Sequence, residues 1–374
     1  MPDFSIGVDL GGTNLRIAAV TVDGQLLEKV TLNTKVALGP DRTIDEMCDA
    51  IQRVATTHKA SGSFRGAGIG VLGIIDMQAG TVRKSANFPG WEDYPVRAEI
   101  ERRLHACALL ENDASVIIDN DGNVAALGEQ WLGAARGVDN VAILTLGTGI
   151  GGGIVLGGKI WHGMNGMAGE FGHVTVEPEG VPCGCGNRGC AERYASASAI
   201  LRMAREAIAS GEAPALSKAA SSGAEFSALA IYNLAMQGDE PSRRIFHTFG
   251  RYLGMMLAGA VNVLNLDAYV LGGGVSSAWD AFAPTMFEEL RQRSLVYAVT
   301  APADVHGSNS SGKDAMRGQP PLRQAQGRLS AVQAEQSSAG AAAASTERKT
   351  IITRALLGSD AGLFGAARAA VLAA

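Results

Sequence analysis

The chain has 374 residues, of which 47% are apolar and 18% are charged, and its formal net charge is −5. This length and apolar content are enough for a large core divided between two domains. The acidic balance disfavours nucleic-acid binding, and no apolar stretch is long enough to cross a bilayer. The first residues enter a strand-like segment without a secretory signal, so we expect a cytoplasmic protein.

Apolar periodicity predicts alternating strands and helices in the first part of the chain. Strands are expected at residues 5–10, 14–22, 25–34, 67–73 and 115–119, and helices at 43–60, 95–104 and 123–132. Asp23-Gly24 has the turn chemistry of a β-hairpin between the second and third strands. The first strand ends in the turn Gly11-Gly12-Thr13.

The same design then restarts. A strand at 140–146 ends in the glycine-rich turn 147–153, and further strands are expected at 154–156, 159–161 and 268–271. The segment at 352–357 precedes the last helix. Helices are expected at 195–209, 226–237, 241–264, 283–293 and 361–373. We interpret the repeated design as two similar α/β domains, each opening with a hairpin whose turn faces a shared cleft.

Residues 303–347 differ in composition from the rest of the chain. They are rich in Ser, Gly, Ala, Gln and Pro and have almost no aromatic or β-branched residues. Such a segment cannot bury enough apolar area to offset its ordering entropy, so we expect a disordered insertion with no catalytic part. The alternative is an alanine-rich helix across 329–344.

Three of the five cysteines lie within eight residues, at Cys183, Cys185 and Cys190, and His173 precedes them. Three thiolates and one imidazole complete a tetrahedral zinc site, and the intervening glycines allow a short loop to fold around one ion. Disulfide or redox chemistry and plain core thiols are the alternatives. Cys48 and Cys107 stand apart and are expected to be small core residues.

Glycine-rich turns follow three of the predicted strands, at Gly11-Gly12, at 147–153 and at 272–274. Such turns expose several backbone N–H groups that can hold phosphate oxygens, which favours nucleotide binding. Asp9 could hold a hydrated Mg²⁺, Thr13 and Thr148 offer hydroxyls, and Arg16 offers a cation. Ordinary tight turns also need glycine. Neither a Walker motif nor a Gly-x-Gly-x-x-Gly helix opening is present.

A candidate base occurs in Asn120-Asp121-Gly122-Asn123, between a predicted strand and a predicted helix. Asp121 there could accept a hydroxyl proton while the two asparagines hold its surroundings. The alternative is that Asp121 only caps the helix. The similar pair Asn112-Asp113 precedes the strand and is expected to be a turn.

Four motifs carry a family resemblance: Asp9-Leu-Gly-Gly-Thr13, Asn120-Asp121-Gly-Asn123, the glycine turn 147–153 and the segment 170–192. Together they resemble the ROK family of sugar kinases and repressors, most closely its bacterial glucokinases. The resemblance covers the chain except for the insertion. It implies an α/β, two-lobed actin-like ATPase (ribonuclease-H-like) fold with an interdomain active-site cleft.

The resemblance also implies a domain division. Residues 1–120 would form a small α/β lobe completed by the C-terminal helix at 361–374. Residues 121–302 would form a large α/β lobe with the zinc-binding loop. After the insertion at 303–347, residues 348–374 would return to the lobe interface and the small lobe.

The family's functional residues can be placed on matching positions of this sequence. By motif, Asp121 matches the catalytic base, and the sugar-hydroxyl ligands match Asn87, Asn120, Asp121, Glu170, His173 and Glu192. The zinc ligands match His173, Cys183, Cys185 and Cys190. The nucleotide and its Mg²⁺ are expected at Asp9, Gly11, Gly12, Thr13, Asn14, Thr148, Gly149, Gly272, Gly273 and Gly274. For Asn87, an exposed turn is the alternative.

The implied reaction is transfer of the ATP γ-phosphoryl group to a hexose hydroxyl, foremost O6 of glucose, with a structural Zn²⁺ that takes no part in the chemistry. Another sugar for the same chemistry (N-acetylmannosamine, N-acetylglucosamine, fructose or allose) and polyphosphate as donor stay open. A ROK transcriptional regulator and a non-catalytic zinc module are further alternatives. The resemblance implies a homodimer or homotetramer, and the charge and composition predict no nucleic-acid or membrane partner.

Overall fold

The computed structural model describes residues 2–85, 88–110, 114–223, 225–302 and 348–373. They fall into two compact units, which we describe separately. Unit 1 comprises Met1–Ile143, Gly152–Gly169 and Ala355–Ala374, and unit 2 comprises Leu144–Gly151 and Glu170–Arg354. The domain division expected from the sequence stays a prediction, and the predicted insertion lies outside the described residues. Among the described helices, none combines the length and apolar character needed to cross a bilayer.

Unit 1 is built on a five-stranded sheet with the order β3-β2-β1-β4-β7. Its strands are β1 (Phe4–Leu10), β2 (Asn14–Thr21), β3 (Leu26–Asn33), β4 (Phe64–Val71) and β7 (Ser115–Asn120). The first three strands are antiparallel neighbours, whereas β1, β4 and β7 run parallel. Leu10 pairs with Val71, which pairs with Asn120. The turn after β1 and the residues after β7 therefore lie at the same edge of the sheet.

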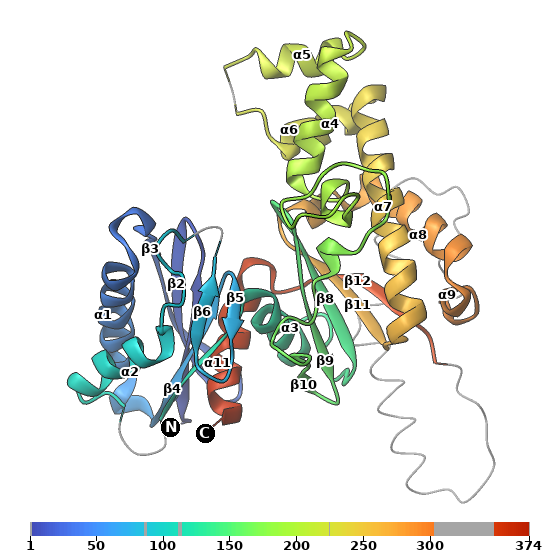
Figure 1. Cartoon of the computed structure of the whole chain (residues 1–374). Helices are drawn as coiled ribbons and strands as arrows, with labels where there is room; N and C mark the ends of the chain where they lie inside the picture. Colours follow the sequence, from blue (N-terminus) through green and yellow to red (C-terminus); the bar gives the residue numbers. More distant parts are fainter. Residues whose placement is uncertain (1, 86–87, 111–113, 224, 303–347, 374) are drawn as a thin grey trace, which may run out of the picture. The chain divides into compact units, whose positions relative to one another are not determined.

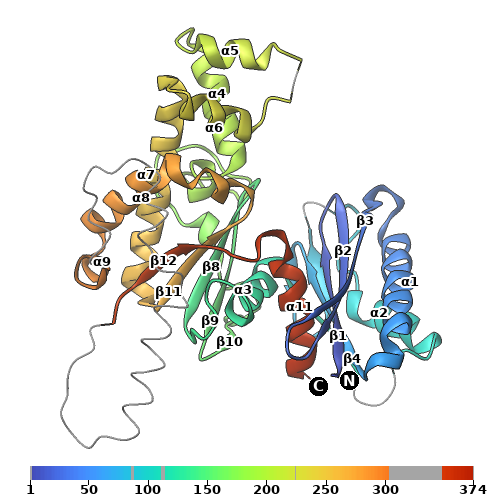
Figure 2. The ribbon, with the colours of Figure 1, turned by 180° about the vertical axis from the view of Figure 1, so that it is seen from behind.

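Helices cover both faces of this sheet. Figure 1 shows α1 (Pro40–His58) and α2 (Val96–Ala106) on one side and α11 (Ala361–Ala373) on the other, and the view from behind in Figure 2 agrees. Alternation along β1 explains the division. Ile6 and Val8 belong to the core that includes Ile44 of α1, while Gly7 lies against α11. A small hairpin of β5 (Ile74–Asp76) and β6 (Thr81–Lys84) follows β4.

The C-terminal helix α11 packs on the sheet and on α3 (Asp121–Trp131) with backbones almost in contact. A Cβ at Gly68 of β4 would overlap the carbonyl oxygen of Ala366, and one at Gly365 would overlap that of Val124 in α3. Glycines on β4 and α11 thus allow an approach that any larger residue would prevent.

The second sheet has the order β10-β9-β8-β11-β12. Its strands are β8 (Val141–Leu146), β9 (Ile150–Leu156), β10 (Lys159–Ile160), β11 (Ala268–Gly272) and β12 (Ile351–Arg354). The α-helices of unit 2 are α4 (Ala197–Ala209), α5 (Pro214–Ala220), α6 (Ala228–Met236), α7 (Glu240–Leu264), α8 (Trp279–Arg293) and α9 (Leu295–Thr300). Helices α7 and α8 pack closely, with the rings of Phe249 and Phe282 4.9 Å apart.

The predicted elements occur in the predicted order, and the main differences are as follows. Helix α3 begins at Asp121 rather than at residue 123, α8 begins at Trp279 rather than at 283, and the short helices α5 and α9 are additional. Strand β9 begins at Ile150, so the glycines 151–153 belong to a strand and not to a turn. Packing explains the glycine at position 153, because a Cβ there would lie 2.6 Å from the carbonyl oxygen of Gly122 in α3.

Candidate functional site

The junction of β7 and α3 in unit 1 carries the candidate base. Asn120 is the N-cap of α3, and its Oδ1 accepts a hydrogen bond from the Gly122 N–H at 2.9 Å. The cap is therefore Asn120, and Asp121 is the first helical residue, half-buried. A carboxylate in the first turn of a helix is stabilised by the helix dipole. This position leaves the helix cap to Asn120, which is compatible with a chemical role for Asp121.

A second carboxylate, which the sequence did not single out, lies directly before this pair. Asp119 is only 3% exposed. Its Oδ1 accepts hydrogen bonds from the Asn120 N–H at 2.7 Å and from Asn123 Nδ2 at 2.8 Å. Its Oδ2 lies 2.8 Å from Nε2 of His162, and this hydrogen bond raises the pKa of His162. A signal existed in the sequence: an acidic residue closing a buried strand needs a donor partner.

The turn after β1 lies at the same sheet edge as this junction. Gly12 and Thr13 are exposed, and the Gly11 N–H donates to the Asn14 carbonyl oxygen at 2.9 Å. Just before the turn, Asp9 Oδ2 lies 3.3 Å from Nη1 of Arg16. Burial raises the pKa of Asp9, and the Arg16 guanidinium opposes that shift. Unit 1 therefore brings together the predicted base and the first predicted nucleotide turn.

The glycine turns of unit 2 have two structural reasons for lacking side chains. A Cβ at Gly149 would lie 2.6 Å from Oε2 of Glu192, so this glycine makes room for a predicted sugar ligand. Gly273 has φ +81°, and a Cβ there would lie 2.5 Å from the Leu146 carbonyl oxygen of β8. Gly274 is exposed, and a Cβ there would meet nothing within 4 Å; Thr148 is exposed as well.

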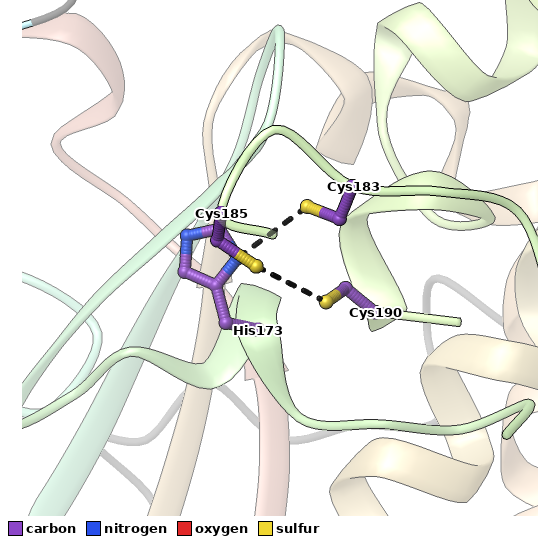
Figure 3. A group of neighbouring side chains, drawn as sticks. All are labelled: His173, Cys183, Cys185 and Cys190. Atoms are coloured by element: carbon purple, nitrogen blue, oxygen red, sulfur yellow. Dashed lines mark hydrogen bonds between the residues drawn. The ribbon is translucent and has the colours of Figure 1, made fainter. Parts of the chain in front are cut away.

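The predicted metal ligands converge in unit 2. One ligand atom from each of His173, Cys183, Cys185 and Cys190 lies within 4.8 Å of the other three (Figure 3). Nδ1 of His173 is 3.7 Å from Sγ of Cys183, and the Sγ atoms of Cys185 and Cys190 are 3.6 Å apart. The second distance exceeds a disulfide bond of about 2.05 Å, and all five cysteines are free thiols. This donor set fits a tetrahedral zinc ion.

The thiols differ in acidity because their surroundings differ. Burial raises the pKa of Cys183 to about 12 and also raises that of Cys190. The pKa of Cys185 is lowered, first by a backbone hydrogen bond from Asn187. A metal binds thiolates, so its binding would release protons from this cluster.

Two carboxylates, both predicted sugar ligands, flank the cluster. Oε1 of Glu192 is 3.1 Å from Sγ of Cys183 and 3.8 Å from Nδ1 of His173, while Oε2 of Glu170 is 3.8 Å from Nε2 of the same ring. The imidazole therefore faces the sulfur cluster with one nitrogen and Glu170 with the other. Asn87, the remaining predicted sugar ligand, lies outside the described residues.

The ROK family profile matches residues 5–326. The chain belongs to the ROK family. A glucokinase from Halalkalibacterium halodurans is 38% identical over 301 residues, which are 80% of this chain and 87% of that protein.

Solved structures agree with this assignment. A ROK hexokinase from Thermus thermophilus has a TM-score of 0.70 and 29% identity, covering 99% of this chain and 98% of that one. A ROK glucokinase from Streptomyces griseus, in complex with glucose and AMPPNP, has a TM-score of 0.69 and 29% identity over 99% of both chains. The predicted α/β fold of the actin-like ATPases is confirmed. The interdomain cleft stays a prediction.

Proposed function

We propose that this chain is a sugar kinase that transfers the γ-phosphoryl group of ATP to O6 of glucose. One observation carries the proposal: in a chain 38% identical to a glucokinase, Asp121 opens α3 at the sheet edge where the first glycine turn also lies. A carboxylate near a phosphate-binding turn is the arrangement that phosphoryl transfer to a hydroxyl requires.

The chemistry needs one proton acceptor. Asp121 accepts the proton of the glucose 6-hydroxyl while the oxygen of that hydroxyl forms a bond to the γ-phosphorus. At the same time the bond between the γ-phosphorus and the bridging oxygen of the β-phosphate breaks. The products are glucose 6-phosphate and ADP. Helix position supports the role, because Asn120 provides the helix cap and the first-turn dipole favours the Asp121 carboxylate.

The nucleotide is expected at the glycine turns. Backbone N–H groups of Gly11, Gly12 and Thr13 would hold phosphate oxygens. The remaining contacts are assigned to Asn14, Thr148, Gly149 and the glycines 272–274. Asp9 would hold the Mg²⁺ that supplies positive charge to the phosphate oxygens during transfer. The Arg16 guanidinium beside Asp9 would add a second positive charge there.

The sugar is expected to bind beside the metal cluster. Glu170, His173 and Glu192 provide carboxylate and imidazole groups suited to sugar hydroxyls, and Asn120 and Asn87 are the further assigned ligands. The four-ligand cluster would hold a structural Zn²⁺, whose task is to keep the loop of residues 170–192 in shape. Nδ1 of His173 faces the cluster, so Nε2 is left toward Glu170 and the sugar.

A coupled ADP-release assay tests the proposal. Glucose should give the highest kcat/KM among glucose, N-acetylmannosamine, N-acetylglucosamine, fructose and allose, and ATP should be preferred to polyphosphate. A clear preference for another sugar would replace glucose as substrate and keep the kinase assignment. Absence of ADP formation with every sugar would refute the kinase assignment itself. The cytoplasmic location stays a prediction. The homodimer or homotetramer also stays a prediction, and light scattering would measure the oligomeric state.

Substitution of Asp121 tests the assigned base. Asp121→Ala should lower kcat by about 10²–10⁴-fold, because general-base catalysis contributes about that much. Glucose affinity by calorimetry should stay within about threefold, since several hydroxyl ligands remain. Asp49→Ala, an exposed acid in α1 of the same unit, is the matched control and should behave as the wild type. Retained turnover in Asp121→Ala would exclude this residue as the base.

A further inference from the structure

Asp119 and His162 form a part-buried polar contact that the proposed chemistry does not use. The carboxylate of Asp119 is 3% exposed and receives three contacts, from the Asn120 N–H, from Asn123 Nδ2 and from His162 Nε2. An ionised carboxylate can only accept, so Nε2 of His162 must carry the hydrogen in this contact. A buried carboxylate left without such donors would cost about 1–3 kcal/mol or more.

The contact joins two segments that are distant in the chain. Asp119 is the penultimate residue of β7, whereas His162 follows β10. The carbonyl oxygen of His162 also accepts a hydrogen bond from the Ala168 N–H at 3.2 Å, which closes the segment 162–168 on itself. His162 therefore holds Asp119 from a small closed loop, while Asn123 holds it from α3.

Asp119 in turn fixes the residues that precede Asp121. Its Oδ1 holds the Asn120 N–H at 2.7 Å, and Asn120 caps α3 through the Gly122 N–H at 2.9 Å. Asp119 thus orients the peptide unit that precedes Asn120, and Asn120 orients the peptide unit that follows Asp121. Removing the His162 donor would leave Oδ2 of Asp119 without its 2.8 Å contact and allow the carboxylate to turn.

We propose that His162 is a positioning residue, which acts through Asp119 to fix the backbone that presents Asp121 to the sugar hydroxyl. The inference rests on the proposed function, because Asp121 is taken to be the base. His162 itself need not touch substrate. A shift of the base by about 1 Å can lower a rate by about 100-fold, so such positioning affects turnover more than ground-state binding.

Paired variants of the full-length chain test this. His162→Ala removes the donor, whereas His162→Gln keeps an N–H at a similar reach from the backbone. We expect His162→Ala to lower kcat by about 10- to 100-fold with the KM for ATP changed less than about threefold. His162→Gln should recover most of the loss. Equal kcat values for the two variants would overturn the proposal.

A matched control exists in the same unit. His58 Nε2 lies 3.0 Å from Glu28 Oε2, so His58→Ala removes a similar histidine–carboxylate contact at α1 and β3. It should leave kcat unchanged. A loss of kcat in His58→Ala equal to that in His162→Ala would show a general stability effect and would also overturn the proposal.

A readout without turnover separates this inference from the proposed function. Amide hydrogen exchange at Asn120 and Gly122 should be about tenfold faster in His162→Ala than in the wild type and in His162→Gln. Unchanged exchange at these amides would refute the positioning role even if the chain phosphorylates glucose. Faster exchange would support that role even if the sugar proves to be another one.

Discussion

Gly149 has no side chain because the carboxylate of Glu192 occupies the space beside its α-carbon. A Cβ built there would lie 2.6 Å from Oε2. A hydrogen bond also holds this turn: the Gly147 carbonyl oxygen accepts from the Ala197 N–H at 2.8 Å. A residue assigned to the nucleotide and one assigned to the sugar are therefore in direct contact, so a change at the first should affect the second.

Gly149→Ala tests this contact. The backbone of Gly149 is not in the left-handed region, and the group it would meet is the mobile end of a side chain, so Glu192 should move while the fold persists. We expect the KM for glucose to rise about tenfold, equivalent to about 1.4 kcal/mol of lost binding. Steady-state kinetics and a thermal melt within about 2 °C of the wild type would establish it.

The control for this change is Gly259→Ala, since a Cβ at Gly259 in α7 meets nothing within 4 Å. It should have the glucose KM of the wild type. If Gly149→Ala changed only the KM for ATP, the glycine would serve the nucleotide alone and its contact with Glu192 would have no functional consequence.

Predictability at this scale depends on separation along the chain. The four candidate metal ligands lie between residues 173 and 190, and their residue types indicate metal chemistry, so the cluster could be predicted before the structure. Asp119 and His162 are 43 residues apart. No local pattern links them, because only the pairing of distant strands brings them together. The role of Gly149 beside Glu192 was hidden for the same reason.

At the scale of elements, α3 holds the entry to the C-terminal helix through one buried carboxylate. Glu129 is fully buried, and its Oε1 accepts from the Leu357 N–H at 2.8 Å. Its Oε2 accepts from the N–H groups of Leu356 at 3.1 Å and Ala134 at 2.7 Å. The same acid therefore fixes the end of α3 and the segment that leads from β12 to α11.

Glu129→Gln should weaken this attachment, because an amide NH₂ group cannot accept hydrogen bonds from the backbone N–H groups it would face. At least one buried donor would lose its partner, at a cost of about 2 kcal/mol. We expect the thermal midpoint to fall by about 4 °C and hydrogen exchange in α11 to rise. Glu206→Gln, an exposed change in α4, is the control. Equal melting of both variants would show that Glu129 does not hold the segment.

The bounds of an element were predicted well where the spacing of its apolar residues determines them. They were predicted poorly where packing against another element determines them. Helix α1 and strands β1 to β3 carry their own periodicity, and their bounds differ from the predicted ones by at most three residues. The glycines 151–153 have low strand propensity and turn-like composition. They nevertheless lie in β9, where α3 packs against Gly153, a contact that composition does not encode.

At the scale of the whole molecule, stability should depend on the metal. The segment of residues 170–192 has little regular structure: two three-residue 3₁₀ turns at its ends, Phe171–His173 and Ala191–Arg193, and the isolated bridges Thr175–Cys190 and Pro182–Arg188. Its backbone hydrogen bonds join turns and isolated bridges and form no helix or strand ladder, so a metal held by four of its side chains would add to the contacts that resist opening. A ligand that binds only the folded chain stabilises it by about 4 kcal/mol at a concentration 1,000 times its Kd.

Chelation of the metal should therefore lower the thermal midpoint of the whole chain by about 8 °C and raise the KM for glucose, with both restored by Zn²⁺.

Cys185→Ser should lose metal by elemental analysis and show the same two changes, because an alcohol replaces one thiolate ligand. Cys107→Ser, a half-buried thiol outside the cluster, should keep both the metal and the midpoint. A lower midpoint with an unchanged KM would separate the metal from the sugar loop. Unchanged values of both would contradict a structural metal, since the four ligands would then hold the loop by their own contacts.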